Sequence, residues 1–257
     1  MKRHCGRTTS IGEKLALVFG CVLVLLSAPA HAIFGFGIHA GKDLVSISGS
    51  DGYGTQDFQA AAQRAGITNF NSTLWNPITL TRSEVSNPWL LGGHFYIDAI
   101  PFIDLEVSAD VALQKYTVRY KSTANPSASE TTDPYFGRVG VYATVRRDII
   151  KLPPLVPIAA LYLGGGLGYH YVSPVAGPDL IVNAYGSSNP SLRKPDVKSL
   201  VKREGSFGYH GLVGVRVKPP IIPLAFRVEG KYTVTRIETY ERPGGIFSVY
   251  VGTSLDF

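Results

Sequence analysis

The chain has few cysteines, and beyond its N-terminal segment it has no long apolar run. Both cysteines, Cys5 and Cys21, lie within residues 1–32, so the rest of the chain has no disulfide or thiolate chemistry. After residue 32 no uninterrupted apolar stretch reaches the roughly 20 residues that a transmembrane helix needs. Any membrane span in this part of the chain must therefore be built from β-strands.

Residues 1–32 have the pattern of a cleaved export signal. Four basic residues precede an apolar run over 15–26, and Ala30 and Ala32 supply the small side chains that favour cleavage after Ala32. The run is too short for a membrane anchor, and it continues past Cys21, which disfavours a lipoprotein site. The sequence thus predicts a signal peptide over 1–32 and a mature domain over 33–257.

Removal of the signal changes the charge balance. The segment takes away four basic residues and one acidic residue, which leaves 21 basic and 18 acidic residues and a net charge of +3 instead of +6. The sequence pI of about 9.2 is therefore not evidence for a nucleic-acid partner, and we expect none.

Residues 245–257 alternate between apolar and small or polar side chains and end on Phe257. One face carries Phe247, Val249 and Val251, while the other carries Ser248 and Tyr250. A period of two is what a strand needs when one face meets lipid and the other meets a polar lumen. The segment is typical of the closing strand of a membrane barrel.

Seven further segments repeat this alternation with one consistent choice of faces. The fold class we predict is all-β, a transmembrane antiparallel up-and-down barrel of eight strands. Ten strands result if Thr73–Thr81 and Leu180–Tyr185 also cross the membrane. The eight predicted strands are Phe34–Ile47, Pro88–Ile100, Ile103–Tyr120, Pro134–Ile149, Ile158–Val172, Gly205–Lys218, Leu224–Tyr240 and Gly245–Phe257.

The connections between these strands are of two kinds. Short turns with proline follow the second, fourth and sixth strands, whereas long polar stretches cover 48–87 and 173–204. Short turns on the periplasmic side and long extracellular loops are usual for bacterial outer-membrane barrels. This order predicts that both termini are periplasmic.

The mature chain resembles the small eight-stranded outer-membrane proteins of the OmpA-barrel, OmpX and OmpW type. The signal segment, the alternation and the terminal residues 252–257 carry this resemblance. The resemblance implies that Tyr250, Leu255 and Phe257 form a C-terminal signal for the barrel assembly machinery. It also implies periplasmic chaperones during biogenesis and a location in the cell outer membrane.

Charged residues gather in the inward-facing phase of the predicted strands. Because an eight-stranded barrel is only wide enough for side chains to fill, we expect these charges to pair inside a plugged lumen. The alternative is a narrow path for ions or small solutes along the same charges. The predicted lumen network is Asp98, Glu106, Asp110, Arg138, Arg146, Arg216, Arg227, Glu229 and Lys231.

Four histidines remain in the mature chain, and all take the inward phase. His170 and His210 lie near the same end of adjacent strands and are a weak candidate for a metal pair, although no carboxylate stands in their layer. A lipid A hydrolase would instead need His, Ser and Glu clustered on the lipid-facing surface. We therefore expect lumen histidines, no catalytic residues, no metal and no cofactor.

Glycines and aromatic residues have positions that suit a barrel in a membrane. Inward glycines at 164, 166 and 168 are expected to make room for Tyr142 or Arg216. Outward aromatic residues lie near both ends of the strands and predict two interfacial girdles. The residues of the two girdles are Trp89, Tyr135, Tyr169, Tyr171, Phe207 and Tyr209 at the loop ends, and Phe34, Phe36, Phe102 and Phe257 at the other ends.

The long loops are where a specific activity is expected. Thr55 can cap a helix over 56–65 with an apolar stripe of Phe58, Ala61, Ala62 and Ala65. This stripe can cover the barrel mouth as a lid, or the loop can pack on itself. The third long loop carries basic residues suited to lipopolysaccharide phosphates, namely Arg193, Lys194, Lys198, Lys202 and Arg203.

Together these features predict a monomeric outer-membrane barrel with a side-chain-filled lumen. Its role is structural or is a surface interaction through the extracellular loops, in contact with outer-membrane lipid and lipopolysaccharide. A narrow channel is the first alternative and a lipid-modifying hydrolase is the second.

Overall fold

The computed structural model describes residues 33–100, 103–152, 158–173, 175–185, 190, 204–219, 223–235 and 245–257. The predicted signal peptide over 1–32 lies outside the described residues, as do the basic positions 193–203 of the third long loop. Among the described residues, no helix is long and apolar enough to cross a membrane.

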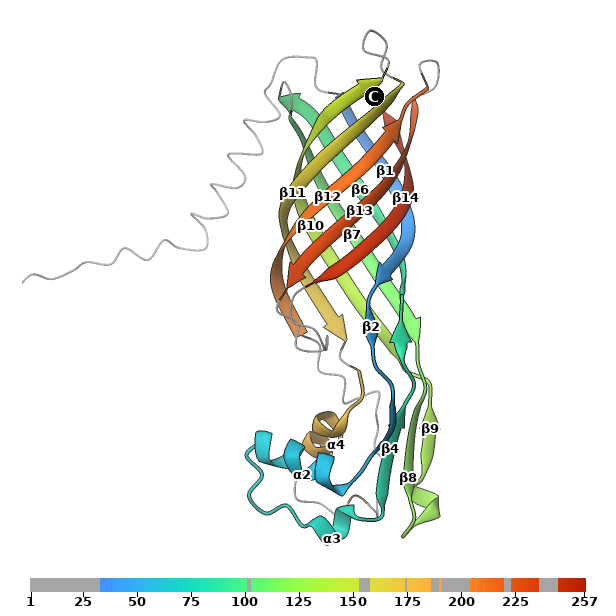
Figure 1. Cartoon of the computed structure of the whole chain (residues 1–257), viewed down its shortest axis with the longest axis vertical. Helices are drawn as coiled ribbons and strands as arrows, with labels where there is room; N and C mark the ends of the chain where they lie inside the picture. The colour runs from blue at the N-terminus through green and yellow to red at the C-terminus, as the bar shows by residue number, and fades with distance from the viewer. Residues whose placement is uncertain are drawn as a thin grey trace, which may run out of the picture.

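Within the described part of the chain, eight antiparallel strands form one closed barrel (Figure 1), which confirms the predicted fold class. Each strand pairs with its sequence neighbours in the barrel, and the first pairs with the last. The chain has the architecture of the small eight-stranded outer-membrane barrels. The barrel strands are β1 (Ile33–Leu44), β6 (Trp89–Ile100), β7 (Ile103–Lys115), β10 (Tyr135–Leu152), β11 (Ala159–Ser173), β12 (Glu204–Val217), β13 (Leu224–Thr235) and β14 (Ile246–Asp256).

The ten-strand alternative is wrong. Residues 73–81 belong to α3 (Ser72–Trp75) and β4 (Ile78–Arg82), and β4 lies in a sheet outside the barrel. Residues 180–185 belong to the helix α4 (Pro178–Tyr185). Apolar residues at these positions are buried against other loops instead of facing lipid.

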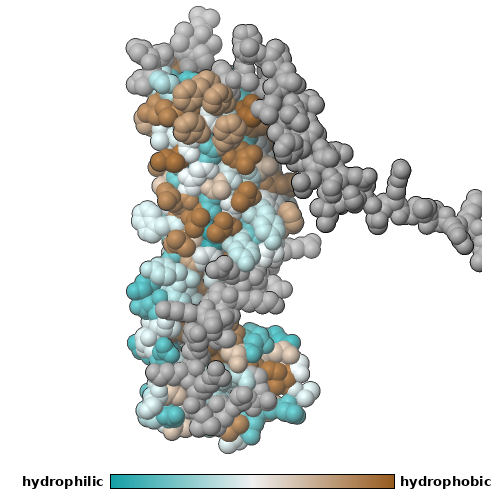
Figure 2. Space-filling view, turned by 180° about the vertical axis from the view of Figure 1, so that it is seen from behind, coloured by the Kyte–Doolittle hydropathy of each residue, from teal (hydrophilic) through white to brown (hydrophobic). Residues whose placement is uncertain are grey.

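The barrel wall is apolar outside and polar inside, as the alternation predicts. Large outward side chains stay exposed in the isolated chain, for example Phe207 at 78% and Leu167 at 68%. Figure 2 shows apolar residues gathered over the barrel and hydrophilic ones toward the loop end. A soluble monomer rarely exposes so large an apolar surface, so this wall is suited to lipid.

The two termini of the described chain meet at one end of the barrel. Phe34 and Phe257 exchange backbone hydrogen bonds of 3.2 and 2.9 Å, and the Phe257 ring stacks on the rings of Phe34 and Phe36. The strand ends that flank the predicted short turns pair at this end (Figure 1), for example Ile100 with Ile103 and Leu152 with Ala159. The long loops lie at the opposite end (Figure 1). Since barrels of this kind have short periplasmic turns and long extracellular loops, we name the two ends periplasmic and extracellular.

The extracellular loops fold into a compact unit, which we call the loop domain (residues 46–86, 116–134 and 175–185). Its sheet has the strand order β3 (Ser50–Tyr53), β4, β8 (Val118–Ser122) and β9 (Glu130–Thr132). A short pair, β2 (Ser46–Ile47) and β5 (Val85–Ser86), connects it to the barrel. Beside the sheet lie α2 (Thr55–Arg64), α3 and α4, and η1 (Pro126–Ala128) follows β8.

Because of this domain, the predicted third strand is too long. The alternation over 103–120 looks continuous, but β7 ends at Lys115 and β8 begins at Val118 in the loop-domain sheet. Tyr120, at the end of the predicted strand, is buried, and its hydroxyl donates a hydrogen bond of 2.9 Å to the carbonyl of Pro190 in the third long loop. Burial raises the pKa of Tyr120 above its ordinary value, so the hydroxyl stays a donor.

The structure contains the helix expected over 56–65 as α2, but its N-cap and its buried face differ from the prediction. Gly54, not Thr55, is the N-cap, and its N–H donates to the Asp57 carboxylate at 2.8 Å. Phe58, Ala61 and Ala62 are buried, whereas Ala65 at the C-cap is exposed. The stripe packs against α4, α3 and β3, so the loop packs on itself and α2 is not a lid on the mouth.

Trp75 lies in the hydrophobic core of the loop domain. Its ring is 4.9 Å from that of Phe58, 5.5 Å from that of Phe70 and 5.9 Å from that of Tyr185, measured between centroids. Barrel residues from the extracellular ends of β10, β11 and β14 complete the same core, which joins the loop domain to the rim. They are Phe136, Val172 and Ile246.

We expect Trp75→Ala to destabilise the loop domain by about 3–5 kcal/mol, because it leaves a large cavity in this core. The barrel, which has its own strand pairings, should stay folded. Limited proteolysis of the refolded protein in detergent should show new cleavage sites confined to the loop domain. Trp89→Ala, on the outer wall, is the control and should give the wild-type pattern; an unchanged pattern for Trp75→Ala would contradict the core we describe.

Candidate functional site: the charged lumen

Eight of the nine predicted lumen charges are buried or partly buried. Seven are buried: Glu106, Asp110, Arg138, Arg146, Arg227, Glu229 and Lys231. Arg216 is partly buried toward the periplasmic end. Asp98 keeps the phase of Tyr96 in the pairing of β6 with β1, but it is exposed and lies outside the buried part of the network.

The extracellular layer of the lumen is centred on Arg138. Its guanidinium contacts both Asp43 oxygens at 2.8 and 2.9 Å and Asp110 Oδ1 at 3.0 Å. Lys231 Nζ donates to Asp110 Oδ2 at 2.7 Å and lies 3.5 Å from the centroid of the Tyr142 ring. As described, this layer contains two carboxylates and two cations, so its charges balance.

The middle layer repeats the same balance. Glu106 Oε2 accepts from Arg146 and from Arg227, each at 2.8 Å. Arg227 also contacts Glu229 Oε1 at 2.9 Å, and the hydroxyls of Tyr162 and Tyr250 donate to the Glu229 carboxylate. Two carboxylates again face two cations among the described residues.

The periplasmic layer is less buried. Arg216 contacts Asp148 at 3.1 Å and Asp104 at 3.9 Å, while Lys218 contacts Asp256 at 3.0 Å. The hydroxyl of Tyr96 also donates to Asp256. Arg216, Asp104, Asp148 and Lys218 are partly exposed, whereas Asp256 and Tyr96 are buried. Solvent therefore screens most of these charges more than it screens those of the two inner layers.

Sequence reasoning missed four carboxylates of this network: Asp43, Asp104, Asp148 and Asp256. Asp43 could have been found, because it continues the inward phase of Gly35, His39 and Gly41 in the first strand. Asp256 continues the inward phase of Ser248 and Tyr250 in the closing strand and could also have been found. Asp104 and Asp148 lie near strand ends, where alternation over a few residues gives a weak signal.

The four histidines point into the lumen, as predicted. His170 and His210 both pack edge-on against the Tyr142 ring, with centroids 5.2 Å away in each case. His210 Nε2 lies 2.9 Å from Thr144 Oγ1. The described residues contain no group of three or more His, Cys, Asp or Glu side chains placed to hold a metal ion.

Small residues make room for the large lumen side chains. A Cβ on Gly168 would lie 2.7 Å from Tyr142 Cδ1, which agrees with the prediction that this glycine accommodates Tyr142. A Cβ on Gly164 would lie 3.0 Å from Arg146 Cγ, so this glycine makes room for Arg146 and not for Arg216. The lumen is therefore closely packed around Tyr142 and Arg146.

The predicted C-terminal signal residues divide between the two faces of β14. Phe257 is exposed on the outer face, and Leu255 shares that face. Tyr250 is buried in the lumen, where it donates to Glu229. Tyr250 thus belongs to the buried lumen network, and its part in a C-terminal signal stays a prediction.

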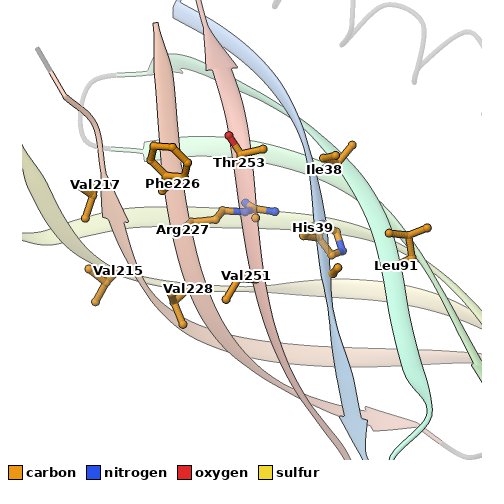
Figure 3. Close-up of a pocket in the computed structure, with 12 residues that line it drawn as sticks. Ile38, His39, Leu91, Val215, Val217, Phe226, Arg227, Val228, Val251 and Thr253 are labelled. Atoms are coloured by element: carbon orange, nitrogen blue, oxygen red, sulfur yellow. The ribbon is translucent and has the colours of Figure 1, made fainter. Parts of the chain in front are cut away.

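The outer wall has a shallow groove of about 470 Å³ over β14 and its neighbours. Figure 3 shows apolar side chains around it, including Phe226, Val228, Val251 and Ile38, with Arg227 and His39 also at its lining. Side chains of this kind suit a lipid acyl chain.

We expect Arg138→Met to cost about 3–5 kcal/mol of unfolding free energy, because it leaves buried carboxylates without their main cation. Adding Asp43→Asn should recover part of this loss, since Lys231 and Asp110 then remain as a balanced pair. Urea unfolding in lipid vesicles measures both.

The matched control is Arg64→Ala, which breaks the exposed pair with Asp179 at 2.8 Å and should cost only about 0–1 kcal/mol. A double variant as unstable as Arg138→Met alone would contradict the idea that charge balance is what the extracellular layer requires.

No family model matches the chain, and no curated protein matches it. Similar solved structures include Ail of Yersinia pestis, in complex with the heparin analogue sucrose octasulfate, at 11% identity over 89% of this chain and 100% of that one (TM-score 0.44). Neisserial surface protein A matches at 14% over 89% and 100% (0.44). OprG of Pseudomonas aeruginosa matches at 12% over 89% and 96% (0.45). The eight-stranded fold of this chain rests on its own strand pairings.

Proposed function

We propose that this protein is an outer-membrane barrel with a filled, non-conducting lumen, and that it acts at the cell surface through its loop domain. The observation that carries the proposal is the pair of buried, charge-balanced layers around Arg138 and Glu106. Its role is either structural or a surface interaction, and in the second case the interacting surface is the loop domain at the extracellular end.

The geometry of the lumen favours a plug over a channel. An ion passing through must separate Arg138 from Asp43 and Asp110, and then Arg227 from Glu106, all of which are almost fully buried. Removing one partner from a buried pair costs several kcal/mol. Because each inner layer is balanced, neither offers the net charge of one sign that a selective pore uses.

The apolar wall and the predicted export signal support an outer-membrane location, reached with the help of periplasmic chaperones and the assembly machinery. Contact with anionic lipopolysaccharide is supported at the extracellular rim, where Lys42 Nζ lies 4.6 Å from the centroid of the Trp89 ring. The lipid-facing phase of β7 ends in a second cation, Lys115, which pairs with Asp133 at 3.1 Å. The basic residues predicted for this contact in the third loop lie outside the described residues.

The hydrolase alternative has less support. A lipid-modifying site needs its base on the lipid-facing surface, whereas His39, His94, His170 and His210 are all buried in the lumen. The described geometry brings none of them together with a nucleophile and a carboxylate at the wall.

We expect the refolded mature chain to give no steady current in a planar lipid bilayer. Arg227→Ala should also be silent, because the extracellular layer around Arg138 stays intact. Lys121→Ala, in the exposed part of the loop domain, is the control for handling and insertion. A steady wild-type current that Arg227→Ala alters and Lys121→Ala does not would replace this proposal with a channel whose ion path follows the lumen charges.

A further inference from the structure

The loop domain contains a concave site of about 380 Å³ at the end of α2. It is lined by Gln59, Gln63, Gly66, Ile67, Thr68 and Phe70. None of these residues is charged. The site lies at the extracellular end, far from the lumen charges (Figure 1 shows α2 at that end).

The shape of the site is fixed by the way α2 ends. Gly66 has a φ of +71°, its N–H donates to the Gln63 carbonyl at 3.1 Å, and the Ile67 N–H donates to the Ala62 carbonyl at 2.9 Å. This is a Schellman motif, which turns the chain back beside the helix. Residues 67–70 are thereby held opposite the helix face that carries Gln59 and Gln63.

The two glutamines offer free amide groups. They lie four residues apart, so they share one face of α2, and both are exposed. Neither side-chain amide bonds to another residue in the described part of the chain. Each amide supplies donors and an acceptor within reach of one ligand.

Phe70 supplies a fixed aromatic surface. One side of its ring stacks on Trp75 with centroids 5.5 Å apart and an interplanar angle of 30°, and Trp75 is itself held by Phe58. Phe70 stays partly exposed and lines the site. Ile67 adds apolar surface and Thr68 adds a hydroxyl.

We propose that this site binds a neutral saccharide of one or two sugar units. This inference rests on the proposed role of the loop domain at the cell surface. Sugar hydroxyls are donors and acceptors at once, which matches carboxamides and a threonine hydroxyl. The C–H faces of a pyranose ring match the exposed face of Phe70. The lack of charge in the lining disfavours sulfated or sialylated ligands, since nothing there would neutralise an anion.

The saccharide can come from the cell's own O-polysaccharide or from glycans of another cell. Two probes separate these sources: O-polysaccharide released from the cells that make this protein, and a printed array of neutral, sialylated and sulfated oligosaccharides. The whole mature chain, refolded in detergent, is used for both.

Trp75 allows binding to be read directly. The sequence has two tryptophans, so in Trp89→Phe the emission comes from Trp75 alone, one ring away from the site. We expect a neutral saccharide to shift this emission in a saturable way, and a sulfated one not to.

The test variant is Gln59→Ala with Gln63→Ala, and the matched control is Gln56→Ala, an exposed glutamine of the same helix outside the lining. We expect the double variant to weaken binding at least tenfold, about the loss expected for two hydrogen bonds, while Gln56→Ala binds as wild type. Far-UV circular dichroism and wild-type protease resistance confirm that the variants are folded.

Failure of all neutral probes to bind, equal binding by the double variant, or a preference for the sulfated glycans would each overturn the saccharide site. None of these results affects the proposal of a plugged barrel, which is tested by the conductance measurement. A conducting wild type that still binds a neutral saccharide would overturn the plug and leave the saccharide site intact.

Discussion

Charge balance inside a narrow, low-dielectric lumen is the constraint on which the rest of the structure depends. Four buried cations and four buried carboxylates can occupy the two inner layers only because each charge has a partner at hydrogen-bond distance, and an unpaired one would cost several kcal/mol. These partners come from strands far apart in sequence, such as Asp43 in β1 and Arg138 in β10. The ion pairs therefore link strands across the lumen, and closure of the barrel brings them together.

The same alternation that sends charges inward sends apolar side chains outward, so one strand serves two solvents. In β13, Arg227, Glu229 and Lys231 are buried while Phe226 and Val228 are exposed. A shift of one residue would place three charges in lipid and two large apolar groups in the lumen. Two constraints therefore fix the register of the strand: contact of its outer face with lipid, and the ion pairs that its inner face makes in the lumen.

These features decide how far the sequence could predict the structure. Period-two alternation with charges in one phase is a strong signal, and it located the barrel strands and seven of the buried charges. It does not reveal which inward charges are buried, since Asp98 keeps the phase of Tyr96 and yet is exposed. It also failed between Lys115 and Val118, since the strand from β7 passes into another sheet with little change in its pattern. The helix α4 and the loop-domain sheet depend on contacts between different loops, which no local pattern in one loop reveals.

The loop domain is not structurally separate from the barrel, because its hydrophobic core includes residues from the ends of barrel strands. Phe136, Val172 and Ile246 belong to barrel strands, yet they pack in the same cluster as Trp75 and Phe58. A rigid rim therefore holds the loop-domain core, and this core holds Phe70 against Trp75. A surface fixed in this way loses little conformational entropy when it binds a ligand. In the function that we propose, a plugged lumen and a fixed extracellular surface are complementary, because the barrel that gives no route for ions also supports the loop domain that binds a ligand.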